Sequence, residues 1–242
     1  MSERPGRPDG RAPDQLRPVS VELGFQEWAE GSVLFSMGRT KVVVAATVSE
    51  DVPRWLRGTG RGWVTGEYSM LPRATLERTA REVQRGRPGG RTQEIQRLIG
   101  RSLRAVTDLS LLGERTITVD CDVLLADAGT RCASITGGYI ALELALRRVM
   151  AEGKLDKLPL TQSVAAVSTG MVDGRALLDL DYSEDSRAEV DANVVMTGDG
   201  GLVEVQATAE RTPLSRAHLD ELLALAQHGI EGLRAAQAAA VG

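Results

Sequence analysis

Residues 177–196 read LLDLDYSEDSRAEVDANVVM, and this stretch decides how the fold is interpreted. It contains most of a strand predicted at 176–181, then a polar loop, then a second strand predicted at 189–196. Side chains alternate between the two faces of a strand. The second strand therefore has an apolar face with Val190, Ala192 and Val194, and a polar face with Asp191 and Asn193.

Two carboxylates of this stretch are candidates for catalysis. Asp185 lies in the loop and Asp191 in the second strand, across a bend that can bring them together. Two such carboxylates can hold Mg²⁺, or one of them can act as a general acid. The alternative is a solvated polar face on a half-buried sheet, and this stretch alone does not decide between the two.

The composition is that of a globular protein with no membrane span. At 242 residues the chain can form one domain with a full core, and no run approaches the roughly 20 apolar residues that a span requires. The first 18 residues, MSERPGRPDGRAPDQLRP, lack the apolar segment of a secretory signal. Cys121 and Cys132 are too few for a disulfide framework and fit no zinc spacing, and Cys121 is expected in the core. We therefore expect a cytoplasmic protein.

Histidine is scarce, which narrows the possible chemistry. The only two histidines are His218 and His228, both near the C-terminus. A Ser-His-Asp or Cys-His mechanism would need one of them, and a histidine-rich metal site is excluded. An enzyme with this sequence would depend on carboxylates, arginines and backbone groups.

Positive charge is concentrated in one part of the chain. Residues 54–104 contain twelve arginines and four acids, a net charge of +8, whereas the whole chain has a net charge of −4. Such segregation in an acidic protein indicates a local site for a polyanion. The chain has only three lysines, so the preference for arginine itself can reflect genome composition.

The hydrophobic pattern predicts one α+β domain of residues 18–242 behind an irregular N-terminal arm, residues 1–17. The predicted strands cover 19–25, 32–37, 41–50, 116–125, 163–172, 175–182, 189–196 and 202–208. The predicted helices cover 76–85, about 92–106, 134–150 and 215–240, and a long loop is predicted at 51–66.

That loop combines glycines and arginines with Trp55 and Trp63. Arginines interleaved with aromatic rings can bind single-stranded nucleic acid, the charges on the backbone and the rings on the bases. The alternative is that the two tryptophans pack against each other, which is the commoner role of such a pair.

Two predicted helix starts are candidate phosphate sites. Arg91 follows two glycines at the beginning of an amphipathic helix, and Gly129-Thr130-Arg131 lies between a strand and a helix. Free N–H groups and the helix dipole favour anions at such positions, and a guanidinium can hold two phosphate oxygens. Each motif is weak alone, and the pair gains weight if the two helix ends converge.

Six motifs resemble bacterial ribonuclease PH, in order and with the spacing intact. They are PDGRxxDQLRP from residue 8, EGSVLFSMGRTKV from residue 30, EYSMLPRAT from residue 67, GGRTQEIQRLIGRSLRA from residue 89, DAGTRCASITGG from residue 127 and LDLDYSEDSRAEVDANVVMTG from residue 178. The resemblance covers residues 8–232, and related chains occur in polynucleotide phosphorylase and the exosome ring.

The resemblance implies a phosphorolytic 3′→5′ exoribonuclease that trims the 3′ ends of tRNA precursors and other structured RNAs. Inorganic phosphate attacks the terminal phosphodiester and a nucleoside diphosphate is released, so the enzyme is a nucleotidyltransferase. The implied fold is that of ribosomal protein S5 domain 2, assembled as a homohexamer, a trimer of dimers.

The resemblance also assigns roles to particular residues. Phosphate is held by Arg91, Gly129, Thr130 and Arg131, whereas Asp185 and Asp191 are associated with catalysis and Mg²⁺. Within the basic segment, Arg73 and Arg61 are our candidates for contacts with RNA.

Three other functions remain open on the sequence alone. A hydrolytic, metal-dependent nuclease would release monophosphates without needing phosphate. A silent ring subunit would only bind RNA, although the retained aspartates and arginines argue against it. A small-molecule kinase would need a glycine-rich ATP loop, which the chain lacks.

Overall fold

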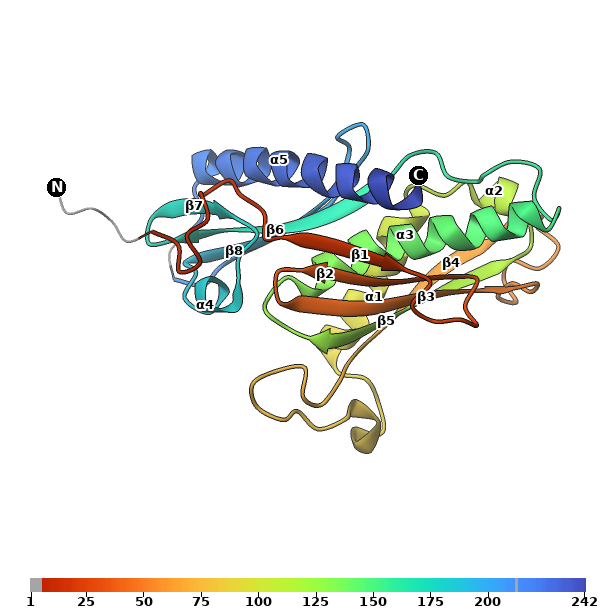
Figure 1. Cartoon of the computed structure of the whole chain (residues 1–242), viewed down its shortest axis with the longest axis horizontal. Helices are drawn as coiled ribbons and strands as arrows, with labels where there is room; N and C mark the ends of the chain where they lie inside the picture. Colours follow the sequence, from red (N-terminus) through yellow and green to blue (C-terminus); the bar gives the residue numbers. More distant parts are fainter. Residues whose placement is uncertain (1–5, 212) are drawn as a thin grey trace.

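The computed structural model describes residues 6–211 and 213–242 and contains two sheets that lie side by side (Figure 1). The larger sheet has the strand order β1-β2-β3-β5-β4, in which only β4 and β5 run parallel. Its strands are β1 (Val19–Leu23), β2 (Gly31–Met37), β3 (Thr40–Ser49), β4 (Trp63–Met70) and β5 (Thr116–Leu125).

The smaller sheet is antiparallel throughout and has the order β7-β6-β8-β9. Its strands are β6 (Val164–Val172), β7 (Arg175–Leu178), β8 (Val190–Thr197) and β9 (Leu202–Ala209). The β6–β7 hairpin turns at Asp173 and Gly174, which both have positive φ, as the Asp-Gly pair predicts.

Three long helices cover these sheets: α1 (Gly90–Arg104), α3 (Thr130–Ala151) and α5 (Arg216–Val241). Short helical turns occupy η1 (Glu82–Arg85), α2 (Leu109–Leu112) and α4 (Tyr182–Asp185). Helix α3 packs against β2 and β3 of one sheet and β6 of the other, while α5 covers β6 and β7. The core therefore surrounds α3.

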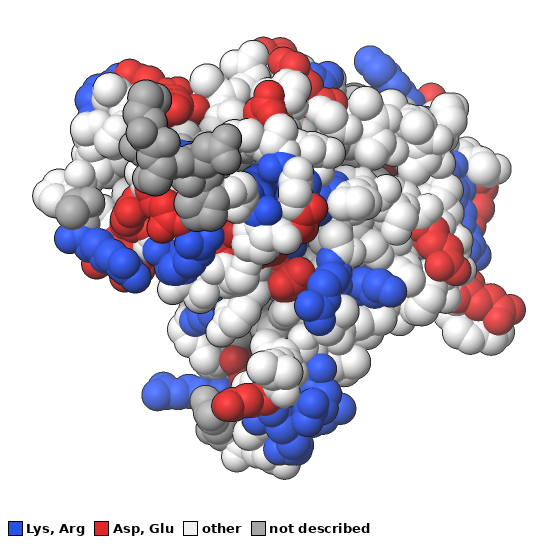
Figure 2. Space-filling model, turned by 60° about the vertical axis from the view of Figure 1, so that its left-hand side comes forward, with Lys and Arg blue, Asp and Glu red and all other residues white. Residues whose placement is uncertain are grey.

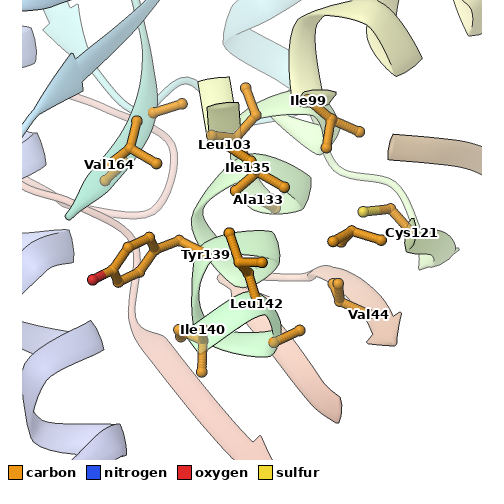
Figure 3. Close-up of a cluster of buried hydrophobic side chains, with 14 of the residues drawn as sticks. Val44, Ile99, Leu103, Cys121, Ala133, Ile135, Tyr139, Ile140, Leu142 and Val164 are labelled. Atoms are coloured by element: carbon orange, nitrogen blue, oxygen red, sulfur yellow. The ribbon is translucent and has the colours of Figure 1, made fainter. Parts of the chain in front are cut away.

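Figure 3 shows this core, in which α3 residues from Ala133 to Leu142 meet side chains from β3, β5, β6 and α1. Almost the whole circumference of α3 is buried, which explains why its sequence is apolar on all sides. Its approach to β2 is close: a Cβ added to Gly31 would lie 2.0 Å from the carbonyl oxygen of Ala141. Only glycine fits at that crossing.

Most of the predicted elements are confirmed. Helix α1 is amphipathic as predicted, and one of its faces is buried through Ile95, Leu98, Ile99, Ser102 and Leu103. Cys121 lies in the core, as expected. Ser215 accepts a hydrogen bond from the backbone N–H of His218 and caps α5. The long helix at 134–150 begins earlier than predicted, at Thr130, because residues 130–133 are buried despite their polar members.

The loop predicted at 51–66 is wrong over its last four residues, because β4 begins at Trp63. This strand escaped prediction because it starts inside a glycine-rich and arginine-rich stretch. Trp63 packs edge-to-face on Trp55, with 4.8 Å between ring centroids, and the Arg104 guanidinium lies 4.2 Å from the centroid of the Trp63 ring. Arg104 also donates to the carbonyl of Val64 at 2.7 Å, so it is a packed residue although it belongs to the basic segment.

The helix predicted at 76–85 is also wrong. Only η1 is helical there, and residues 71–89, which we call the projecting segment, extend away from the body (Figure 1). Leu76 is 90% exposed, so its side chain does not pack against the body to stabilise a helix there.

Residues 6–18 of the N-terminal arm contain no helix or strand, as predicted, but they are packed against the body. Arg7, Arg11 and Arg17 are only 8%, 9% and 3% exposed. Residues 1–5 of the predicted arm lie outside the described residues. Among the helices that the structure describes, none is both long enough and apolar enough to cross a bilayer.

Candidate active site

Helices α1 and α3 both begin at the same edge of the larger sheet. Strands β4 and β5 are parallel, and each is followed by a connection that leads into one of these helices at its carboxyl end. The backbone N–H of Ala126 donates to the carbonyl of Ala74 at 2.8 Å, which joins the two connections. The two helix starts are therefore neighbours, as the phosphate hypothesis requires.

The beginnings of α1 and α3 differ from those of the other helices. Asp108, Asp181 and Ser215 cap α2, α4 and α5 with side-chain oxygens. By contrast, α1 and α3 follow Gly89 and Gly129, which have no side chain to cap the first N–H groups of either helix. Uncapped N–H groups at a helix start attract anions.

The turn before α3 is held in a left-handed conformation. Ala128 and Gly129 have φ of 59° and 66°. Thr40 fixes this turn, because its hydroxyl donates to the carbonyl of Ala128 at 2.7 Å and accepts from the N–H of Asp127 at 3.0 Å. The hydroxyl of Thr130 shares a hydrogen bond of 2.8 Å with the phenol of Tyr68. The hydroxyls of Thr40 and Thr130 are thus fixed by hydrogen bonds at the start of α3.

Arg131 is 8% exposed and links three elements. Its Nη1 lies 3.0 Å from Oε1 of Glu94 on α1 and also contacts Oε1 of Gln206 on β9. Gln206 is paired with Asn193 on β8, which belongs to the same strand face as Asp191. Arg131 therefore brings the α1 start and the polar face of the smaller sheet together.

The two aspartates reach the site from different elements. Asp191 is on β8, where Val190 and Ala192 are buried as the alternation predicts. Asp185 ends α4, a single turn with a capping box between Asp181 and Glu184, in place of the predicted loop. Asp185 and Asp191 line one hollow of about 410 Å³ with Glu210 and Arg211. The structure thus brings the two carboxylates together.

The pKa shifts of these aspartates connect them to the arginines. Partial burial and, after it, the charge of Asp191 raise the pKa of Asp185 above its ordinary value, against the opposing charges of Arg91 and Arg131. Partial burial and then Glu210 raise the pKa of Asp191, again against Arg131 and Arg91. Arg91, Arg131, Asp185 and Asp191 are therefore close enough for their charges to affect one another. Both aspartates hold protons more tightly than usual.

The two arginines predicted to contact RNA lie at opposite ends of β4. Arg73 is exposed just after the strand ends, on the side of the helix starts. Arg61 is exposed just before the strand begins, and eight residues of strand separate the ends by about 26 Å. The structure brings Arg73, and not Arg61, to the end of β4 at which α1 and α3 begin.

Sequence reasoning did not single out several residues that shape the site. Tyr68 and Glu94 belong to quoted motifs, but nothing in their spacing identified them as partners of Thr130 and Arg131. Gln206 could have been found, because it alternates onto the polar face that pairs with β8.

Taken together, the site places arginines at two helix starts within electrostatic reach of two carboxylates, which is the arrangement of an enzyme that acts on phosphate esters. Two family models match this chain: "3' exoribonuclease family, domain 1" over residues 15–147, and "3' exoribonuclease family, domain 2" over residues 162–229. Together they account for the regions that form the larger and the smaller sheet.

Curated relatives agree over nearly the whole chain. The Ribonuclease PH of Moorella thermoacetica is 58% identical over 236 residues, covering 98% of this chain and 94% of that protein. The Ribonuclease PH of Caulobacter vibrioides (strain NA1000 / CB15N) is 57% identical, with coverage of 98% and 99%. The chain therefore belongs to the ribonuclease PH family of phosphate-dependent 3′→5′ exoribonucleases.

Solved structures agree on the fold. Rice (Oryza sativa) Rrp46 matches with a TM-score of 0.78 at 19% identity, covering 98% of this chain and 100% of that one. A chain of the Archaeoglobus fulgidus exosome with RNA bound to the active site matches with a TM-score of 0.80 at 24% identity, covering 95% and 91%. The predicted α+β fold of the ribonuclease PH type is confirmed.

Proposed function

We propose that this enzyme trims the 3′ ends of tRNA precursors and other structured RNAs, using inorganic phosphate held by Arg91, Arg131 and Thr130. The observation that supports these roles is that Arg91 and Arg131, at the starts of α1 and α3, act electrostatically on both Asp185 and Asp191. We also propose a cytoplasmic location, which suits these substrates.

Repulsion between two anions is the main barrier that the site must lower. The attacking phosphate and the RNA phosphodiester are both negatively charged. Arg91 and Arg131 neutralise the attacking anion, while the N–H groups of α3 and the fixed hydroxyl of Thr130 orient it. Such positioning and neutralisation lower a barrier by several kcal/mol.

In the reaction, a phosphate oxygen forms a bond to the terminal phosphorus and the bond from that phosphorus to the preceding 3′-oxygen breaks. The leaving oxygen then needs a proton or a cation. The raised pKa of Asp185 makes it a suitable proton donor. The products are a shortened RNA with a 3′-hydroxyl and a nucleoside diphosphate.

Asp185 and Asp191 also fit Mg²⁺. Among the described residues no group of three or more His, Cys, Asp or Glu side chains forms a complete metal site. Mg²⁺ commonly takes one or two carboxylates and completes its shell with water and substrate phosphate oxygens, so this pair suits it. When bound there, Mg²⁺ would stabilise charge on the scissile phosphate.

The projecting segment is the proposed guide for RNA. Figure 2 shows basic side chains gathered on this protruding part of the molecule. Arg73, Arg78, Arg81 and Arg87 are exposed there, at the carboxyl end of β4 beside the site. Arginines in such a position bind the RNA backbone without reading its sequence.

The decisive test is product analysis on a 3′-extended tRNA. With phosphate and Mg²⁺ present, we expect shortening of the RNA and release of nucleoside diphosphates, measured by chromatography. Without phosphate, shortening should stop. Release of monophosphates in phosphate-free buffer would instead establish a hydrolytic nuclease.

The role of Arg131 is tested by replacing it with alanine. Loss of a charged, two-oxygen contact should raise the apparent KM for phosphate by about 10–100-fold. The matched control is Arg148→Ala at the other end of α3, where Arg148 is exposed and pairs with Glu152. Equal KM values for the two variants would remove Arg131 from the phosphate site.

We also propose a hexameric ring, a trimer of dimers, on the resemblance to the family. The connection between β1 and β2 leaves Phe25 and Trp28 44% and 89% exposed, which suits burial against another copy. Sedimentation at micromolar concentration should show hexamers, and a purely monomeric boundary would exclude the ring.

A further inference from the structure

The candidate site contains residues from both halves of the fold, one built on each sheet. Residues 6–18 contact both halves. Arg91, Thr130 and Arg131 come with the larger sheet, whereas Asp185 and Asp191 come with the smaller one. Residues 6–18 precede every strand of the larger sheet, yet they pack mainly against the smaller sheet. The N–H of Leu178, at the end of β7, donates to the carbonyl of Pro13 at 2.8 Å.

Arg7 holds the short helix that ends in Asp185. Its Nε and Nη2 donate to the two carboxylate oxygens of Glu184 at 2.8 and 2.7 Å, a two-point contact between residues 177 positions apart. Glu184 is completely buried and immediately precedes Asp185. Helix α4 is one turn long, so its own hydrogen bonds cannot fix its orientation. The Arg7–Glu184 pair supplies an anchor from outside.

Arg17 joins the smaller sheet to the turn before α3. Its Nη2 and Nε donate to the carboxylate of the fully buried Asp179 at 2.7 and 3.0 Å, and its backbone N–H donates to the same carboxylate at 2.8 Å. Its Nη1 donates to the carbonyl of Asp127. The carboxylate of Asp127 accepts in turn from the N–H of Tyr182, the first residue of α4, at 3.3 Å. One guanidinium thus sets the spacing between the two halves.

The backbone at this junction is held in an unusual conformation. Asp179 has a φ of 53°, which non-glycine residues seldom adopt, and its carbonyl accepts from both Arg7 and Arg11 at 3.0 and 2.9 Å. Its N–H donates to the carbonyl of Ser168 at 2.7 Å. Such a conformation persists where surrounding contacts determine it, and here the arginines of residues 6–18 provide them.

We propose that residues 6–18 are a positioning element for the active site: Arg7 sets the orientation of Asp185 through Glu184, and Arg17 sets the Gly129-Thr130-Arg131 turn relative to both aspartates. This inference rests on the proposed function. None of the three arginines needs to touch phosphate or RNA, so each acts through the residue that it holds. The two links predict different kinetic consequences.

The first test replaces Arg7 with lysine, which keeps the charge and loses the two-point fork. Displacing Asp185 while leaving the phosphate residues in place should lower kcat by about 10–100-fold, as for other residues that support a catalytic group. The KM for phosphate should stay within about two-fold, since Arg91 and Arg131 are untouched. The matched control is Arg187→Lys beside α4, whose partner Asp173 is exposed, and its kcat should equal that of the wild type.

The second test replaces Arg17 with lysine. Because Arg17 holds the turn before α3 through Asp127, both kcat and the KM for phosphate should change, the KM rising by about 5–10-fold. A purely structural role would lower the active fraction in both variants and leave the KM for phosphate unchanged in both. That shared pattern would overturn the inference.

A third variant, Arg7→Ala, tests the position of the guanidinium directly. Added guanidinium ion should restore part of its kcat and leave Arg7→Lys unaffected. If Arg7→Ala shows no cooperative thermal transition, Arg7→Lys decides the question. Wild-type enzyme that releases no nucleoside diphosphate would refute the proposed function itself, whereas an active wild type with unchanged kcat in Arg7→Lys would refute only the positioning role.

Discussion

Residues 6–18 and the projecting segment, residues 71–89, have the same kind of sequence, but the first is packed against the body and the second extends away from it. Both are rich in proline, glycine and arginine, and neither contains a strand or an α-helix. In the first, Arg7, Arg11 and Arg17 are almost completely buried. In the second, Arg73 and Arg78 are exposed.

The difference lies in the acids that each segment meets. Residues 6–18 meet Asp179 and Glu184, both with no exposed surface, more than 160 positions along the chain. The projecting segment has Glu82 as an internal partner, which accepts from Thr92 and the N–H of Gly89 and so ties the segment to α1. Buried arginines thus hold the fold together, and exposed ones remain available for a polyanion.

The largest expected effect follows from breaking a buried pair. Arg17→Met would leave the buried Asp179 carboxylate with only the longer contact to Arg11 at 3.8 Å, which should lower the free energy of unfolding by about 3–5 kcal/mol. For a chain of this length the melting temperature should fall by roughly 6–20 °C. Arg78→Met in the projecting segment should change it by less than about 0.5 kcal/mol. Equal stabilities in calorimetry would show that the two segments do not differ energetically.

A smaller effect is expected on RNA affinity when the exposed arginines are removed. Arg73→Ala combined with Arg78→Ala should weaken tRNA binding by about 5–10-fold and reduce the slope of log affinity against log salt by about 1 for each lost phosphate contact. The melting temperature should not change. Arg148→Ala is the control, and a salt slope identical to that of the wild type would exclude these arginines as backbone contacts.

The smallest expected effect is on thermal stability, when the partly buried Asp191 is replaced. The folded protein raises the pKa of Asp191 above its ordinary value of 3.8, so stability is lost as the pH rises through the folded pKa. Asp191→Asn removes that cost and should raise the melting temperature by about 1–3 °C at pH 7.5 while abolishing activity. The difference should shrink as the pH falls toward the ordinary pKa of 3.8 and vanish well below it, where the carboxyl is protonated in both states. A lower melting temperature at pH 7.5 would show that ionised Asp191 stabilises the fold.

The sequence predicted what depends on local pattern. The amphipathic helix α1, strand β6 and helix α5 each follow from the pattern of neighbouring residues, and each is confirmed. The candidate site was also accessible, because Arg91, Arg131, Asp185 and Asp191 stand in motifs of a known family. Their catalytic roles stay predictions, and so does the division into an arm of residues 1–17 and a domain of 18–242.

The sequence failed where a distant contact decides the outcome. Strand β4 forms because it pairs in parallel with β5, some fifty positions later, and the glycines and arginines that precede it concealed that pairing. The helix expected at 76–85 has good local propensity, but its Leu76 is exposed and only residues 82–85 form a helical turn. No local pattern reveals that Arg7 is buried against Glu184, since the two are separated by most of the chain.

The thiol of Cys132 lies where the start of α3 meets β8, with its sulfur 3.3 Å from Oδ1 of Asn193. Burial raises the pKa of this thiol to about 12, and the other cysteine, Cys121, is equally enclosed. At neutral pH an alkylating reagent can therefore label either one only after the molecule opens. The two native cysteines therefore report on opening of the structure. If Cys132 is labelled faster than Cys121, the contact between α3 and the smaller sheet at the active site opens before the rest of the core.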